Sequence, residues 1–296
     1  IPTLFPQKIK TLFLPNGFVF YGWWIVFIAS FVMYLRSLFW IQSYGAYAVV
    51  FSKEFGWSMA LLAAAYTLIH VESGLLGPVQ GWMADRYGPR LIVSIGLLMY
   101  GIGILFLTLV ETLPVYLLAI IIISVGISLG GYQTLMVSIV SWFKQHRTKA
   151  IALTQLGHSL GGLSVPMLAY GMEKFGWRTI AFASGLAIIL LGIPLVQNIR
   201  HRPEEKGDVV DGKITAEHYN KSEERNNEIV SLSWQSALRT RAFWFVSAGH
   251  SIALLSVSSV LVHLIPHLTN TLGMGLAQAG LVFSTLSISQ IIGLSC

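Results

Sequence analysis

The stretch GWMADRYGPR, residues 81–90, lies between two long apolar segments. It holds one aspartate, the arginines Arg86 and Arg90, and the chain breakers Gly88 and Pro89. Two helices that cross a bilayer need a water-exposed turn between them, and Gly and Pro favour such turns. Arginines beside membrane helices favour the cytoplasmic side. The stretch therefore predicts a tight, charged hairpin between two membrane helices, on the cytoplasmic face.

The composition of the whole chain supports a membrane protein. Hydrophobic residues make up 54% of the chain, charged residues only 11%, and the mean hydropathy is +0.68. A soluble domain carries about a quarter charged residues. The net charge of +6 comes from short basic clusters between apolar runs, so we interpret it as a topological signal and expect no nucleic-acid partner. The single cysteine, Cys296, excludes a disulfide within the chain.

Apolar runs long enough to cross a bilayer as helices recur along the chain, since a crossing needs about 20 residues. Transmembrane β-barrels show short alternating segments instead, so we predict an all-α, polytopic bundle. Glycines inside the runs, such as Gly126 and Gly157, predict close helix packing. The predicted spans are 22–50, 60–84, 91–110, 115–142, 150–172, 177–198, 241–270 and 277 onward.

The basic residues orient the bundle. If the N-terminus is cytoplasmic, only Lys53, Lys174 and Arg178 fall on the opposite side, and Arg36 lies inside a span. All other Lys and Arg residues then fall on the cytoplasmic side, as the positive-inside rule requires. We therefore expect a multi-pass protein of the cell (inner or plasma) membrane with a cytoplasmic N-terminus.

The polar segment 199–240 has no apolar periodicity and predicts a cytoplasmic linker. It divides the chain into a cytoplasmic tail (1–20), a six-helix bundle (21–198), the linker, and the start of a second bundle (241–296). The chain begins without Met and stops inside an apolar run, so we expect a fragment.

Arg36 is the first candidate for a binding residue, because it falls near the middle of the first span. An arginine there costs at least ~2.5 kcal/mol and should face protein or a water-filled cavity. At 100° per residue it shares one stripe with Trp40, Ser43 and Tyr47, which together suit a carboxylate ligand. The alternative is a structural ion pair.

His70 and Glu72 in the second span are the candidate partners of Arg36, at comparable depth. They lie about 200° apart on a helix, so they cannot both face Arg36. Glu72 is either the counter-ion of Arg36 or a proton carrier, and His70 either lines the cavity or packs at a helix crossing. A plain hydrogen-bonding role is the alternative for both.

The seventh span contributes His250, His263 and His267, and we expect His263 to line the cavity. His263 and His267 are spaced to share one helix face, but no third ligand with suitable spacing accompanies them. We therefore predict no metal site and no cofactor.

The hairpin resembles the G-x-x-x-D-R-x-G-R/K-R/K signature that follows the second helix in the major facilitator superfamily, with Pro89 the one departure. The resemblance implies two six-helix halves joined by a central loop, so that this chain holds the first half and the first two helices of the second. It implies a secondary transporter with alternating access around a midplane site. It also implies that the hairpin acts as a conformational latch. The matching residues are Gly81, Asp85, Arg86, Gly88 and Arg90.

Two further stretches resemble the monocarboxylate porter and oxalate–formate antiporter branch of this superfamily. The resemblance implies that the basic residue of the first helix, here Arg36, contacts a substrate carboxylate. It also implies small organic anions as substrates, with proton coupling or exchange, and a monomer in the bilayer. The charge pair typical of the eighth helix is absent from residues 277–296. The matching residues are Gly22, Trp23, Trp24, Trp142, Phe143, Lys144, Arg147, Ala150, Ala152, Gly157, Gly161 and Gly162.

There are three alternatives to an anion transporter. An exporter of drugs or other metabolites is the first, although the fourth span has no arginine and the fifth no Gly-Pro dipeptide, both of which such exporters typically carry. A membrane hydrolase is the second, because GHSLGG at 157–162 matches the nucleophile-elbow pattern around Ser159. That serine lies in an apolar helical run without a preceding strand, so we predict helix packing and no enzyme. A non-transporting sensor is the third.

Overall fold

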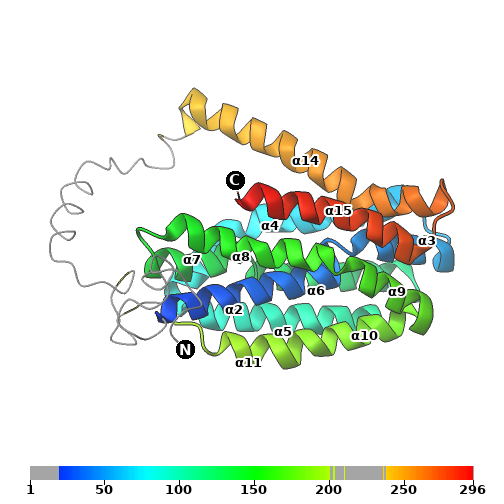
Figure 1. The fold of residues 1–296 in the computed structure, drawn as a ribbon, viewed down its shortest axis with the longest axis horizontal. Coiled ribbons are helices and arrows are strands. Elements are labelled where there is room, and N and C mark those ends of the chain that lie inside the picture. The colour runs from blue at the N-terminus through cyan, green and yellow to red at the C-terminus, as the bar shows by residue number, and fades with distance from the viewer. Residues whose placement is uncertain (1–19, 201–202, 204–209, 211–235, 237, 296) are drawn as a thin grey trace, which may run out of the picture.

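The structure, a computed structural model, describes residues 20–200, 203, 210, 236 and 238–295. These residues form antiparallel helices joined by short turns, with no strand in the described part of the chain (Figure 1). The predicted tail and most of the predicted linker lie outside the described residues, so the domain boundaries stay predictions.

The helices pair with the predicted spans to within a few residues, and several spans are built from two or three pieces. The first six spans are α2 (Tyr21–Arg36), η1 (Ser37–Ile41) and α3 (Tyr44–Phe55); α4 (Met59–Tyr87); α5 (Pro89–Leu107); α6 (Leu113–Leu129) and α7 (Tyr132–Trp142); α8 (Arg147–Leu163) and α9 (Val165–Phe175); α10 (Trp177–Ala187), η2 (Ile188–Gly192) and α11 (Ile193–Val196). After the linker come α14 (Arg241–Asn270) and α15 (Leu276–Ser295).

Seven of these spans are long and apolar enough to cross a membrane, and the fifth, α8 with α9, is not among them. The reason lies in its position. α8 packs between α2 and α15 in the interior of the bundle, so it needs less lipid-facing apolar surface. It can therefore carry polar residues such as Gln155, His158 and Ser159.

Glycine permits the closest helix contacts, as predicted from the sequence. A Cβ at Gly157 would overlap the carbonyl oxygen of Ser30 in α2, and a Cβ at Gly126 would overlap the backbone of Tyr100 in α5. Small residues let helix backbones approach each other in lipid. These two contacts fix α8 against α2 and α6 against α5.

A glycine turn of the same backbone conformation occurs at each of the two opposite ends of the bundle. Gly88 and Gly176 have φ of +81° and ψ of 147° and 148°, a conformation that favours glycine. Two residues beyond each glycine an arginine ties two helices together. Arg90 donates to Gln197 Oε1 (2.9 and 2.6 Å), and Arg178 pairs with Glu54. We call the ends of the bundle the Gly88 end and the Gly176 end.

The last two helices contact the first six mainly toward the Gly176 end (Figure 1). α14 buries residues only between Leu261 and Thr269, where Gly45 of α3 lets it approach closely. Glu173 of α9 accepts hydrogen bonds from the N–H groups of Leu276 (2.6 Å) and Ala277 (3.3 Å) at the start of α15. Residues 241–256 of α14 are almost all exposed, so α14 packs on the first six spans only through its second half.

Candidate functional site

Arg36 is the last residue of α2 and lies where the helix changes to the π-helical turn η1. Its Nη1 contacts Met33 Sδ at 3.6 Å, and its buried Nε has no hydrogen-bond partner. The only ion pair among the described residues joins Arg178 and Glu54. Arg36 is therefore a charged group inside a membrane helix without a counter-ion in the described chain.

The surroundings of Arg36 are aromatic and basic. Its guanidinium interacts electrostatically with Tyr66 of α4 and Tyr100 of α5, and with His70 of α4 and His158 of α8. The Tyr100 hydroxyl also donates to the Arg36 carbonyl oxygen at 3.4 Å. No carboxylate belongs to this set, so the arrangement suits an anion.

The predicted stripe of Arg36, Trp40, Ser43 and Tyr47 does not lie on one regular helix. The π-helical turn η1 and the turn at residues 42–43 interrupt the regular 100° spacing. Trp40, Ser43 and Tyr47 are each 0% exposed and pack in the core, with Trp40 and Tyr47 rings 5.2 Å apart. Ser43 donates to the Leu38 carbonyl oxygen. None of the three lines either of the two cavities described below, and their contact with substrate stays a prediction.

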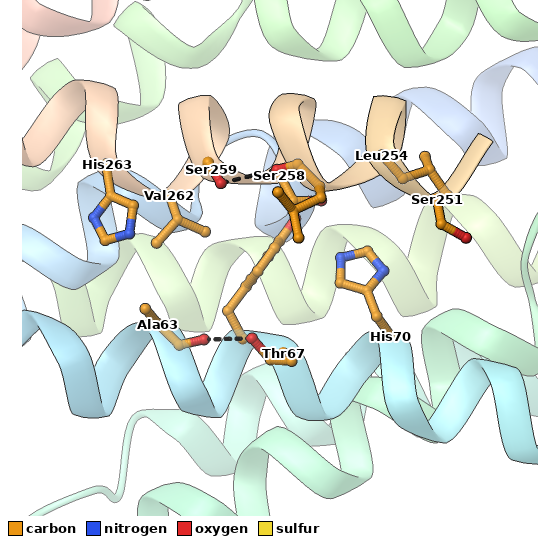
Figure 2. A pocket seen from close by; sticks show the side chains of 11 residues that line it. Ala63, Thr67, His70, Ser251, Leu254, Ser258, Ser259, Val262 and His263 are labelled. Carbon is orange, nitrogen blue, oxygen red and sulfur yellow. Dashed lines mark hydrogen bonds between the residues drawn. The ribbon is translucent and has the colours of Figure 1, made fainter. Parts of the chain in front are cut away.

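A cavity of about 400 Å³ lies between α4 and α14. His70 lines it from α4 and His263 from α14, on opposite walls (Figure 2). The His70 ring packs edge-on against Tyr66, 5.3 Å between centroids. Serines of α14 supply further polar groups. The structure thus brings two predicted histidines to one cavity, which we call the α4–α14 cavity.

Glu72 points elsewhere, as its angular separation from His70 predicts. Its Oε2 accepts hydrogen bonds from Ser124 of α6 (2.9 Å) and Ser73 (3.4 Å), and its buried Oε1 has no partner. Ser128 donates to Ser73 at 3.2 Å, and Gln80 donates to Ser128. Glu72 is therefore not the direct counter-ion of Arg36 in this structure. It is the first residue of a hydrogen-bonded chain that continues through Ser73 and Ser128 to Gln80, toward the Gly88 end.

A second cavity, of about 270 Å³, lies between α8 and α15, and we call it the α8–α15 cavity. Gln155, His158 and Ser159 line it from α8, and Gln290 from α15. Ser37 (2.6 Å) and Gln42 (3.0 Å) donate to the His158 carbonyl oxygen, which ties this wall to the turn after Arg36.

The sequence did not single out His158 as a site residue. The cluster of Gln155, His158 and Ser159 in an otherwise apolar span was the signal for a cavity wall. Ser159 is 2% exposed inside a continuous helix, so the geometry is that of helix packing rather than of a nucleophile elbow.

The hairpin residues occupy the Gly88 end. Gly81, Asp85 and Arg86 are exposed, and the Arg86 guanidinium lies 5.4 Å from the centre of the Trp82 ring. Gly88 forms the turn, while Arg90 is bound to Gln197 within the first bundle. The latch itself stays a prediction.

The remaining histidines of α14 show no metal geometry. His250 and His267 are exposed, and no group of three His, Cys, Asp or Glu side chains suited to a metal occurs in the described part of the chain.

Known proteins resemble this chain in sequence. A probable hexose phosphate transport protein of Chlamydia trachomatis is 23% identical over 245 residues, 81% of this chain and 54% of the relative. The oxalate:formate antiporter of Oxalobacter formigenes is 26% identical over 224 residues, 74% of this chain and 50% of the antiporter. A transporter of the MFS type from Gibberella moniliformis is 32% identical over 145 residues, 45% and 33% of the two chains. The chain spans about half the length of the first two.

Solved structures share the fold. A bacterial homologue of the human lysosomal transporter Spinster, inward-facing and unoccupied, matches with a TM-score of 0.69 at 17% identity, covering 90% of this chain and 60% of the other. The D-xylose–proton symporter matches with a TM-score of 0.61 at 18% identity, covering 93% and 67%.

These matches confirm the predicted all-α, multi-pass fold and the resemblance to the oxalate–formate branch. The sequence profile of the Major Facilitator Superfamily matches residues 12–296, nearly the whole chain. Because this profile covers nearly the whole chain and the helices are long enough to cross a membrane, this chain belongs to the Major Facilitator Superfamily.

Proposed function

We propose that this protein is a secondary transporter of small organic anions, mono- or dicarboxylates, which works by alternating access with proton coupling or by exchange. The observation that carries the proposal is Arg36, whose buried Nε has no partner and which lacks a counter-ion in the described chain. A substrate carboxylate satisfies both needs, since a guanidinium binds it through two parallel hydrogen bonds.

The histidines around Arg36 support an anionic substrate. His70 of α4 and His263 of α14 line the α4–α14 cavity, and His158 of α8 lines the α8–α15 cavity, so each cavity carries a group that can bear a positive charge. Two relatives are named for anion transport, one for oxalate and formate and one for hexose phosphate. We keep Trp40, Ser43 and Tyr47 as proposed substrate contacts, although all three side chains are buried in this structure.

We further propose that Glu72 is the proton carrier in a coupled cycle. Its carboxylate lies inside a membrane helix, has one unpartnered oxygen, and begins the polar chain toward the Gly88 end. Intramembrane carboxylates in such chains serve proton relays. His70 is the second candidate, because it faces both Arg36 and the α4–α14 cavity.

The proposed setting is the plasma or inner membrane, with the protein as a monomer and the Gly88 end in the cytoplasm. The positive-inside rule supports this orientation, because Arg86, Arg90, Lys144, Arg147 and Lys149 all lie at that end. The hairpin residues Gly81, Asp85, Arg86, Gly88 and Arg90 then form the proposed conformational latch on the cytoplasmic side.

An exporter of other metabolites is the second candidate function. A fujikurins efflux protein of Gibberella fujikuroi is 27% identical over 191 residues, and an agnestins efflux protein of Paecilomyces divaricatus is 30% identical over 139 residues. This likeness covers 62% and 44% of the chain. Arg36 favours the anion transporter, because a neutral metabolite leaves its charge uncompensated.

The test is counterflow of oxalate, formate, lactate and succinate in proteoliposomes with the complete transporter. We expect uptake of at least one anion, loss of more than tenfold in Arg36→Ala, and partial retention in Arg36→Lys. Arg147→Lys serves as a matched control, since Arg147 bonds backbone carbonyl oxygens at the end of α7 and lies outside the cavities. Normal anion transport by Arg36→Ala would refute the site.

A further inference from the structure

The α8–α15 cavity contains two buried acceptors that nothing in the described chain satisfies. The side-chain oxygens of Gln155 on α8 and Gln290 on α15 are buried and lack hydrogen-bond partners. Both residues line this one cavity, from opposite helices. Buried polar atoms in proteins are almost always hydrogen-bonded, so a pair of unpartnered acceptors marks a place where a ligand supplies donors.

The chemistry of these acceptors limits the ligand. An amide oxygen needs a donor, and an ionised carboxylate or phosphate has acceptors only. A hydroxyl group donates one hydrogen bond and accepts others, so it can donate to a glutamine oxygen and accept from a glutamine amide. Two glutamines whose oxygens lack donors therefore suit a hydroxyl group, which both donates and accepts, better than a second anionic group, which only accepts.

The cavity also adjoins the proposed anion site. Gln155 and His158 lie three residues apart on one face of α8, and both line this cavity. Hydrogen bonds from Ser37 and Gln42 to the His158 carbonyl oxygen hold this wall against the turn that follows Arg36. Through Ser37, the residue next to Arg36, this cavity wall is thus joined to the segment that carries the proposed anion site.

We propose that Gln155 and Gln290 form a hydroxyl-binding subsite, which makes the preferred substrate a hydroxylated anion rather than a simple carboxylate. This inference rests on the proposed role of Arg36 in binding the anionic group. The shared chemistry is an anionic group with a hydroxyl group close by, which both a hydroxycarboxylate and a sugar phosphate offer.

The experiment compares ligands that differ in hydroxyl groups, using the complete transporter in detergent and proteoliposomes. Malate against succinate tests the hydroxycarboxylate, and glucose 6-phosphate against inorganic phosphate tests the sugar phosphate. Two measurements give the affinity for each member of a pair: inhibition of counterflow by the ligand, and the shift of the melting temperature that the ligand causes. We expect the wild type to prefer the hydroxylated member of at least one pair by tenfold or more.

In the variants Gln155→Leu and Gln290→Leu, the ratio of the affinities for the hydroxylated and the plain ligand should fall toward 1. The affinity for succinate or phosphate should stay within about twofold of the wild-type value. Gln155→Asn keeps an amide and should retain part of the preference, which separates lost hydrogen bonding from a disturbed fold. Equal wild-type affinity for both members of both pairs, or an equal loss for both members in the variants, overturns the subsite. Failure of the wild type to bind any anion overturns the proposed function instead.

Discussion

Gly157 makes the tightest helix contact near the site, and Gly157→Ala is the sharpest test of the packing that positions Arg36. A Cβ at this position would overlap the carbonyl carbon and oxygen of Ser30, which are backbone atoms and cannot rotate away. α2 and α8 would have to separate. Overpacking of this kind costs about 1–3 kcal/mol, and the better helix propensity of alanine offsets up to about 1 kcal/mol of it.

Gly74→Ala is the matched control, because Gly74 also lies inside a membrane helix but has no atom within 4 Å of the position of its Cβ. It should be neutral or slightly stabilising. Thermal unfolding of the two purified full-length variants measures the difference, and we expect Gly157→Ala to melt several degrees below Gly74→Ala, since 1 kcal/mol corresponds to about 2–4 °C in chains of comparable size. Equal melting temperatures would refute the close α2–α8 contact. Because α2 carries Arg36 and α8 carries His158, anion affinity should fall together with stability.

Two further changes test other parts of the structure. Glu72→Gln can keep the hydrogen bond from Ser124 but cannot carry a proton. We therefore expect exchange of anions to persist, while accumulation of anions driven by a pH gradient is lost. Undiminished gradient-driven accumulation would exclude Glu72 as the proton carrier. Gly88→Ala places a side chain at φ +81°, which costs about 1–3 kcal/mol, whereas Gly81→Ala meets open space, so only the former should lower the melting temperature.

The sequence could predict what depends on composition and periodicity. Apolar runs of membrane length located every span, and the glycine and arginine of the hairpin at residues 81–90 located a turn whose geometry the structure confirms. The fifth span was recovered as well, although α8 is polar enough to fall short of an ordinary membrane span. Its flanking turns, at residues 143–146 and at Gly176, set its limits.

The details of the site depend on contacts between helices, which one sequence does not contain. Regular helical spacing put Trp40 and Tyr47 beside Arg36, but the π-helical turn η1 rotates the rest of the span, and both rings enter the core. The angular argument separated His70 from Glu72 because both lie in the part of α4 before Pro78, where the helix is uninterrupted. His158 was missed as a cavity residue because its importance comes from the closeness of α8 to α2, which Gly157 permits.

Arginine at a membrane span has no fixed role, and three arginines of this chain show what decides it. Arg90 finds an amide oxygen of Gln197, and Arg178 finds the carboxylate of Glu54, so both serve to join helix ends. Arg36 has only a methionine sulfur within reach and keeps a buried, unpartnered Nε. An unpaired arginine inside a membrane helix costs free energy of insertion and does not stabilise the fold. Under the proposed function, the negative charge of the substrate is the partner that the described chain does not supply to Arg36.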